Sequence, residues 1–147
     1  PGKGYSHTYQ HVEKNLQYPA ILVDGSCAIS PWGHQLRIGG TMELSGINNN
    51  VLVKRMKGIF KSVSDFYPGL KIDCPPEDKI WNGLRPVTPD GLPFIGRHAA
   101  VNNVLFAGGH AMLGLSLAAG TGKLVKEIIG KNPLSVSIEA FRLNRFG

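Results

Sequence analysis

The segment from Asn103 to Ile129 constrains the fold most strongly, because it joins a strand signal, a turn signal and a helix signal in one order. An apolar run of strand length, Asn103 to Ala107, is followed by Gly108-Gly109-His110 and then by an apolar helical pattern from Leu113 to Ile129. This order is typical of the β-α units of doubly wound α/β domains. The sequence therefore predicts part of an α/β domain in its second half.

The first half of the chain has a different pattern, with several strands and one amphipathic helix. Strand formers gather in short segments at residues 5–9, 20–23, 27–31 and 35–44. The last two segments flank Trp32-Gly33-His34, which predicts a hairpin. Apolar residues at helical spacing predict a helix from Val51 to Phe66, with its N-cap in the Asn48-Asn49-Asn50 cluster and its end at Pro68-Gly69. Antiparallel strands with a helix favour an α+β region of the substrate-binding type.

Composition and charge narrow the class of protein. With 42% hydrophobic and 18% charged residues, the chain is of the ordinary globular kind. No apolar run reaches the roughly 20 residues that a membrane-spanning helix needs. The net charge is +6, but the basic residues are scattered or lie on the solvated face of one helix, so no nucleic-acid partner is expected. A non-catalytic basic binding module, with salt-dependent binding to nucleic acid, stays the alternative from a different class.

Several chemical signatures are missing. Cys27 and Cys74 lack the spacing of metal ligands, so we expect no metal site and reduced thiols in a cytoplasmic compartment. Gly120-Thr121-Gly122-Lys123 is no phosphate loop, because that pattern needs glycine and a hydroxyl residue where Leu117 and Leu124 stand. The opening residues show neither an initiator Met nor a signal-peptide pattern, so we expect the chain to begin inside a longer protein.

Two stretches carry a family resemblance. Residues 81–97 read WNGLRPVTPDGLPFIGR, and residues 103–117 read NVLFAGGHAMLGLSL. Together they resemble the C-terminal signature of the D-amino-acid oxidase superfamily, most closely its bacterial D-amino-acid dehydrogenase branch. Lys3-Gly4-Tyr5-Ser6 and the run from Leu36 to Glu43 resemble the same branch, so the resemblance spans about Lys3 to Phe146.

The resemblance implies an α+β fold in two parts. Residues 1–85 would form a substrate-binding antiparallel sheet with a helix, and residues 86–147 a β-α unit of a split FAD-binding α/β domain. The GxGxxG part of such a domain, which binds the ADP portion of FAD, is not found in this sequence. We therefore expect an N-terminal FAD-binding half as partner, weak or absent FAD binding by this chain alone, and no activity. We also expect exposed apolar surface on the β-α unit, which would promote oligomers.

The resemblance also assigns site residues. It gives the α-carboxylate of the substrate to Arg85 and places Tyr5 and Met42 in the substrate cavity. A guanidinium held rigid by the following Pro86 can bind a carboxylate through two parallel hydrogen bonds. A tightly packed turn and helix start would lie beside the flavin, where free N–H groups and the helix dipole favour negative charge. These residues are Gly109, His110, Ala111, Met112, Leu113, Gly114, Leu115 and Ser116.

Each of these residues also has a plain structural interpretation. Arg85 could bridge strands, Tyr5 and Met42 could serve packing alone, and His110 could be a hydrogen-bonded core residue. For the residues beside the flavin, the structural alternative is a packed β-α turn. The sequence alone leaves these alternatives open.

The activity implied is oxidative deamination of D-amino acids to 2-keto acids and ammonia, by hydride transfer to FAD rather than by a protein nucleophile. An electron acceptor such as a quinone is expected, and the location is the cytoplasm, with peripheral contact to the inner membrane face. Amine oxidases of the same superfamily that act on glycine, sarcosine or hydroxyproline are the alternatives. Ala28 stands where glycine-oxidase-like relatives place a tyrosine, which favours substrates with larger side chains.

Overall fold

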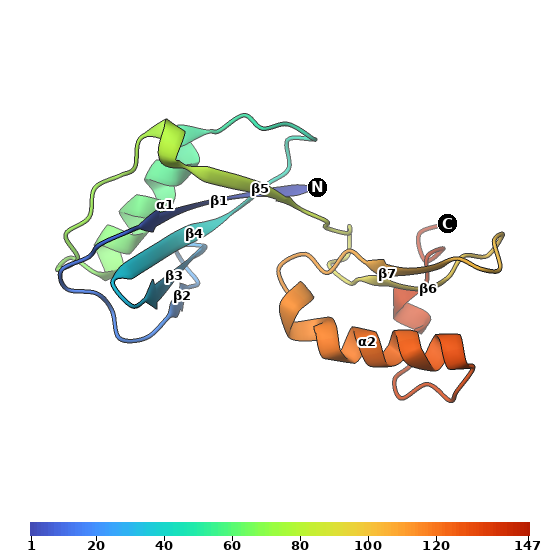
Figure 1. Cartoon of the computed structure of the whole chain (residues 1–147). Coiled ribbons are helices and arrows are strands. Elements are labelled where there is room, and N and C mark those ends of the chain that lie inside the picture. The colour runs from blue at the N-terminus through green and yellow to red at the C-terminus, as the bar shows by residue number, and fades with distance from the viewer. The chain divides into compact units, whose positions relative to one another are not determined.

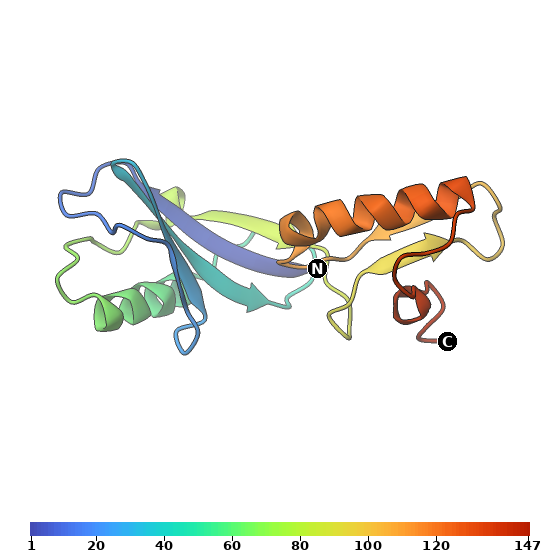
Figure 2. The same cartoon turned by 90° about the horizontal axis from the view of Figure 1, so that it is seen from below.

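The computed structural model describes residues 1–147, which divide into two compact units, Pro1–Leu84 and Arg85–Gly147. Both units are drawn in Figure 1, and Figure 2 gives a second view, turned by 90°. None of the helices combines the length and the hydropathy that a bilayer crossing requires.

The first unit is built on a five-stranded sheet in the order β2-β3-β4-β1-β5. Helix α1 (Val53–Phe66) packs on one face of this sheet, as Figures 1 and 2 show. The short helix η1 (Glu77–Lys79) precedes the last strand. The strands are β1 (Gly2–Tyr9), β2 (Ala20–Leu22), β3 (Cys27–Trp32), β4 (Gln35–Glu43) and β5 (Trp81–Arg85).

The hairpin of β3 and β4 forms where the sequence predicted it. The two strands pair antiparallel, and Gly33 takes a positive φ of 59° in the turn between them. Along β4, Leu36 and Ile38 are buried while Arg37 between them is exposed, so the alternation of a half-buried strand is confirmed. Between β1 and β4 the register shifts once, and on β4 Thr41 adopts a φ of 63° close to the shift.

Helix α1 closes the core of the first unit. Its buried residues Met56, Ile59 and Val63 follow helical spacing and face the sheet. Leu52 and Phe66, which the pattern also placed on the apolar face, are about half exposed. The helix is therefore confirmed, although its apolar face is shorter than the sequence suggested.

The predicted asparagine cap of this helix is wrong. Leu52 occupies the N-cap position and makes no side-chain capping bond. The Asn48 amide oxygen instead accepts hydrogen bonds from the Lys3 ammonium group at 2.6 Å and from the Asn50 backbone N–H at 3.1 Å. A charged donor from a distant strand is a stronger partner for that oxygen than the free N–H groups of the helix.

The second unit is a hairpin with a long helix. Strands β6 (Phe94–Arg97) and β7 (Leu105–Gly108) pair antiparallel, and both α2 (Gly114–Gly130) and the short helix η2 (Glu139–Phe141) contact β6. The predicted order of strand, glycine turn and helix is confirmed. An antiparallel sheet with a helix, followed by a β-α unit, is the α+β class that the sequence predicted. The assignment of the two parts to substrate and FAD binding stays a prediction.

Candidate functional site

Arg85 stands at the end of β5 and its side chain is half-buried. One terminal nitrogen of its guanidinium, Nη1, is buried and has no hydrogen-bond partner. Buried N–H groups are nearly always bonded in folded proteins, and a charged group is the most costly to leave unpaired. This nitrogen is therefore poised to donate to an acceptor from outside the chain.

The turn that leads into α2 lies directly against the segment after Arg85. The Ala111 N–H donates to the Pro86 carbonyl at 3.0 Å. Gly109 adopts a φ of 82°, and a Cβ added there would lie 2.8 Å from the methyl carbon of Thr88. Both the positive φ and the close approach require glycine at this position. Within the second unit, the structure thus holds the residue next to Arg85 against the turn predicted to lie beside the flavin.

The N-terminus of α2 is uncapped. Its N-cap residue Leu113 makes no side-chain bond, and the first turn carries no acidic residue. Met112, Leu113 and Leu115 are all exposed at this end of the helix. The first N–H groups of a helix have no partner within it, so a positive helix end is left available to an anionic or dipolar group.

His110 is engaged within its own unit. Its ring nitrogen Nε2 lies 2.9 Å from the hydroxyl of Thr121, which ties the turn to the middle of α2. The side chain is half-buried. This geometry favours the structural interpretation of His110, in which it fixes the angle at which the turn enters the helix.

Tyr5 and Met42 lie in the first unit. Tyr5 is 1% exposed, and its hydroxyl donates to Glu43 Oε2 at 2.6 Å and accepts from the Leu52 N–H at 3.3 Å. Burial, and then the bond to Glu43, raise the pKa of Tyr5. Met42, the neighbour of Glu43, is half-buried near the end of β4. The substrate roles of Tyr5 and Met42 stay predictions.

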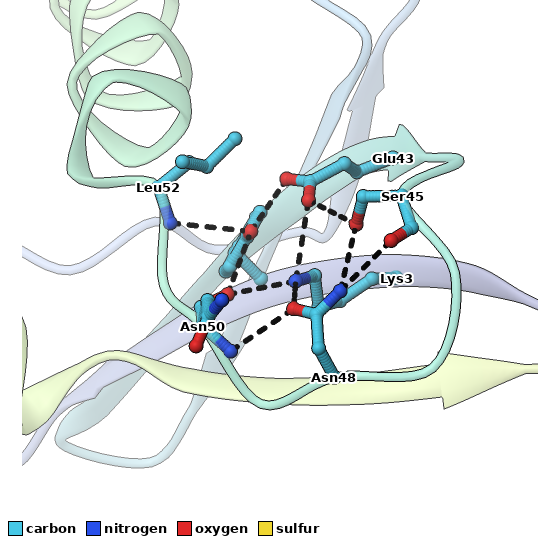
Figure 3. Close-up of polar contacts among 7 residues, drawn as sticks. Lys3, Glu43, Ser45, Asn48, Asn50 and Leu52 are labelled. Atoms are coloured by element: carbon cyan, nitrogen blue, oxygen red, sulfur yellow. Dashed lines mark hydrogen bonds and ion pairs between the residues drawn. The ribbon is translucent and has the colours of Figure 1, made fainter.

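Tyr5 belongs to a buried charged network that sequence reasoning missed. Lys3 is 1% exposed; its ammonium group lies 3.2 Å from Glu43 Oε1 and donates to the Asn50 carbonyl at 2.7 Å. Ser45 donates to the same Glu43 oxygen at 2.5 Å, as Figure 3 shows. The bonds from Ser45, Tyr5 and Lys3 hold the pKa of Glu43 at about 2. This network fixes the loop between β4 and α1 to the start of β1.

A weak signal for this network exists in the sequence. Lys3 and Tyr5 are two residues apart on β1, so their side chains point to the same face of the sheet. The Lys3 side chain therefore lies on the face where Tyr5 is buried. A lysine at a core-facing position needs a partner, because an unpaired buried charge is very costly. Glu43 cannot be identified as that partner from the sequence, because the register shift between β1 and β4 interrupts the alternation of inward and outward side chains along β4.

The first unit also carries a shallow groove of about 690 Å³. The Arg37 guanidinium stacks on the Trp81 ring at 5.5 Å from its centroid and donates to the Ser6 hydroxyl at 3.0 Å. None of the predicted site residues lines this groove, which is formed by Ser6, His7, Thr8, Gln10, Arg37, Lys79 and Trp81.

Comparisons with known proteins place the chain in a family. The family model described as "FAD dependent oxidoreductase" matches residues 1–128. A D-amino acid dehydrogenase of Allorhizobium ampelinum is 32% identical over 148 residues, covering 99% of this chain and 34% of the relative. A D-amino acid dehydrogenase of Methylobacterium radiotolerans is 32% identical over 149 residues, covering 99% of this chain and 35% of the relative. The chain thus spans about a third of the length of these curated relatives.

Solved structures share the fold. Glycine oxidase from Geobacillus kaustophilus superimposes with a TM-score of 0.80 at 24% identity, over 99% of this chain and 39% of that protein. L-proline dehydrogenase from P. horikoshii gives a TM-score of 0.78 at 21% identity, over 97% of this chain and 38% of that protein. Because the family model matches most of its length, the chain belongs to the FAD-dependent oxidoreductase family.

Proposed function

We propose that this chain supplies the carboxylate-binding arginine and one wall of the flavin pocket of an FAD-dependent D-amino acid dehydrogenase. The two relatives of that name, at 32% identity along 99% of the chain, support this choice of activity. The reaction would be oxidative deamination of a D-amino acid to a 2-keto acid and ammonia.

The observation that carries the proposal is the buried, unpartnered Nη1 of Arg85. An arginine binds a carboxylate with two parallel hydrogen bonds, which fix both the position and the orientation of the bound group. Pro86 restricts the backbone directly after Arg85, so the guanidinium is presented from a rigid base. A substrate α-carboxylate is the acceptor that fits this nitrogen.

The turn and helix start fit the cofactor that the family name implies. Gly109 lets the turn pack closely against Thr88, and α2 has no side-chain cap to occupy its first N–H groups. We propose that residues Gly109 to Ser116 lie along the flavin, with the positive helix end stabilising the negative charge of its reduced form. Bound FAD would supply the acceptor for the hydride from the substrate Cα, while the protein orients the substrate.

Small residues across the sheet support a substrate with a side chain. Ala28 on β3 is exposed and pairs with Gly39 on β4, and Gly39 in turn pairs with Ser6 on β1. Ile21 on the edge strand β2 is the first bulky residue in this row, next to Ala28. Because the three positions on β3, β4 and β1 are small, we propose D-amino acids larger than glycine as substrates. Tyr5 and Met42 are kept as proposed cavity residues, and a quinone as the proposed electron acceptor.

The test uses a hybrid enzyme, in which this chain replaces the matching third of the Allorhizobium ampelinum relative. Arg85→Lys keeps the charge but loses the bidentate geometry, so the KM for a D-amino acid should rise about 10–100-fold. Arg97→Lys is the matched control, because Arg97 is exposed on β6. An unchanged KM in the Arg85→Lys hybrid would refute the carboxylate role. Parallel assays with a quinone analogue and with O₂ identify the acceptor.

We further propose that the N-terminal FAD-binding half of the longer protein covers the outer face of α2. That face carries apolar and small residues. Leu115 is 92% exposed, and a Cβ added to Gly122 would have no atom within 4 Å. In the isolated chain, such a face should bind hydrophobic dyes and promote self-association. Leu115→Ser should reduce both effects, whereas Val23→Ser, at an apolar residue of the first unit that is 78% exposed, should not. A strictly monomeric chain that binds no dye contradicts the proposal.

The isolated chain is proposed to lack activity, because the relatives carry about two thirds of their length beyond it. Purified chain, FAD, D-alanine and a dye acceptor provide the assay. Dye reduction that depends on D-alanine would overturn this part of the proposal.

A further inference from the structure

Arg145 makes several polar and aromatic contacts with one short segment, residues 90–94. Its Nε and Nη2 donate to the two carboxylate oxygens of Asp90 at 2.7 and 2.9 Å, and Nη2 also donates to the Leu92 carbonyl at 2.7 Å. The guanidinium lies 3.9 Å from the centroid of the Phe94 ring. Arg145 therefore holds the turn between β5 and β6, and its partner Asp90 is 55 positions away in sequence. We call the pair of Asp90 and Arg145 the clamp.

Asp90 also accepts a hydrogen bond from within the same turn. Its Oδ1 accepts from the Leu92 N–H at 3.1 Å, while the Thr88 hydroxyl donates to the Leu92 carbonyl at 2.8 Å. Gly91 takes a φ of 76°, which the turn requires. The bonds from Arg145 lower the pKa of Asp90, so this carboxylate stays charged and paired. The turn from Thr88 to Leu92 is thus held from both sides.

The clamped turn leads directly to Arg85 and to the turn before α2. The Thr88 methyl carbon lies only 2.8 Å from the position that a Cβ on Gly109 would take, and the Pro86 carbonyl accepts from the Ala111 N–H at 3.0 Å. Arg85 directly precedes Pro86 in the chain. Any movement of the clamped turn would therefore move Pro86 and loosen its bond to Ala111.

We propose that Asp90 and Arg145 are positioning residues, which hold residues 86–88 against the turn at residues 109–111 and thereby set the orientation of Arg85. The effect on substrate binding rests on the proposed function, whereas the coupling between the clamp and the turn does not. Neither residue is assigned a contact with substrate or flavin.

The degree of burial makes this pair different from an ordinary surface ion pair. The side chains of Arg145 and Asp90 are 10% and 30% exposed, whereas those of the nearby pair Arg142 and Glu139 are 57% and 66% exposed. Bidentate pairs shielded from water are the strong ones, and exposed pairs contribute little. Arg142 is therefore a matched control in the same C-terminal segment.

The first experiment measures amide hydrogen exchange in the 147-residue chain. Asp90→Asn keeps the oxygen that accepts from Leu92 but removes the charge, and Arg145→Ala removes the clamp. In both variants the Ala111 amide should exchange about tenfold faster, the factor that corresponds to 1.4 kcal/mol. The amide of Leu124, inside α2, should keep its rate, and Arg142→Ala should leave both amides unchanged.

Two results would overturn the proposal. An unchanged Ala111 rate in Asp90→Asn and Arg145→Ala would show that the clamp does not reach the turn. Equal acceleration at Ala111 and Leu124 in both variants would show that the pair only stabilises the unit as a whole, without a positioning role.

The second experiment uses the hybrid dehydrogenase. Asp90→Asn should raise the KM for a D-amino acid about tenfold, change kcat by less than about twofold and leave the flavin content unchanged, since a misplaced guanidinium weakens substrate binding first. If Arg85→Lys has no effect on KM, the proposed function fails, and the exchange experiment still decides the coupling. If Arg85→Lys raises KM but Asp90→Asn does not, the positioning role fails.

Discussion

The two units of the chain differ in how much apolar surface they bury. The first unit buries a continuous cluster of eleven residues between its five-stranded sheet and α1. In the second unit, Ile95 and Leu124 are the buried hydrophobic residues, beside a two-stranded sheet. Its large apolar side chains lie largely outside, among them Val104, Phe106, Met112, Leu113, Leu115, Ile129 and Val136. With two strands and one long helix, the second unit buries less apolar surface, so it should be the less stable of the two.

The charged pairs of the two units reflect the same difference. Lys3 and Glu43 lie inside a unit whose core is already closed, and their bonds attach a loop to it. Asp90 and Arg145 lie in a unit with little core, where a polar clamp holds a turn that packing does not hold. The first unit therefore has the properties of an independent folding unit, whereas the second has only a small core of its own.

The sharpest test of this contrast is truncation of a core side chain in each unit. Ile38 is fully buried in β4, so Ile38→Ala should lower the free energy of unfolding of the first unit by roughly 2–5 kcal/mol. Leu115→Ala in the second unit should change stability by no more than about 0.5 kcal/mol, because that side chain is exposed. Native-state hydrogen exchange measures each unit separately. A loss below 1 kcal/mol for Ile38→Ala would break the comparison.

A second prediction compares the units without any substitution. The amides of β4 should open only with global unfolding of the first unit, whereas those of β6 should open about 100-fold more often, a difference of about 2.7 kcal/mol. The cause is the smaller buried area of the second unit. Equal protection of β4 and β6 would show that the second unit is stable by itself. The proposed cover on α2 predicts that, in the hybrid enzyme, the protection of β6 rises toward that of β4.

Local signals predicted the elements of the fold well. Periodicity gave α1, and turn chemistry gave the hairpin at Gly33. Each of these signals is contained within a few residues, so a sequence reader can see it. The asparagine cap failed because Asn48 bonds to Lys3, 45 positions away.

In the candidate site too, local features could be predicted from the sequence and long-range contacts could not. Arg85 and the glycine turn could be selected from their sequence pattern, because those residue types in that order are specific. The missing partner of Arg85 Nη1, the bond from Ala111 to Pro86 and the clamp by Arg145 depend on contacts between distant segments. No periodicity encodes such contacts, so the structure was needed to find them.

The smallest expected effect concerns the charged network of the first unit. Bonds from Ser45, Tyr5 and Lys3 lower the pKa of Glu43 from its ordinary value of 4.5 to about 2. A carboxyl group with a lowered pKa stabilises the folded state fully above its unfolded pKa, and this contribution is lost as the pH falls through the folded value. The first unit should therefore lose this part of its stability between pH 4.5 and about pH 2.

Ser45→Ala removes the bond with the largest effect on Glu43, so the pKa of Glu43 should rise toward 4.5 and the acid-dependent loss of stability should become smaller. At neutral pH the loss for one hydrogen bond should be about 0.5–1.5 kcal/mol. Ser64→Ala is the control, because the Ser64 hydroxyl donates to the Phe60 carbonyl in α1 and faces no carboxylate. Carbon NMR titration of the Glu43 carboxyl group, with hydrogen exchange at several pH values, measures both quantities. A Glu43 pKa that stays near 2 in Ser45→Ala would show that the bonds from Lys3 and Tyr5 suffice to keep this carboxyl group charged.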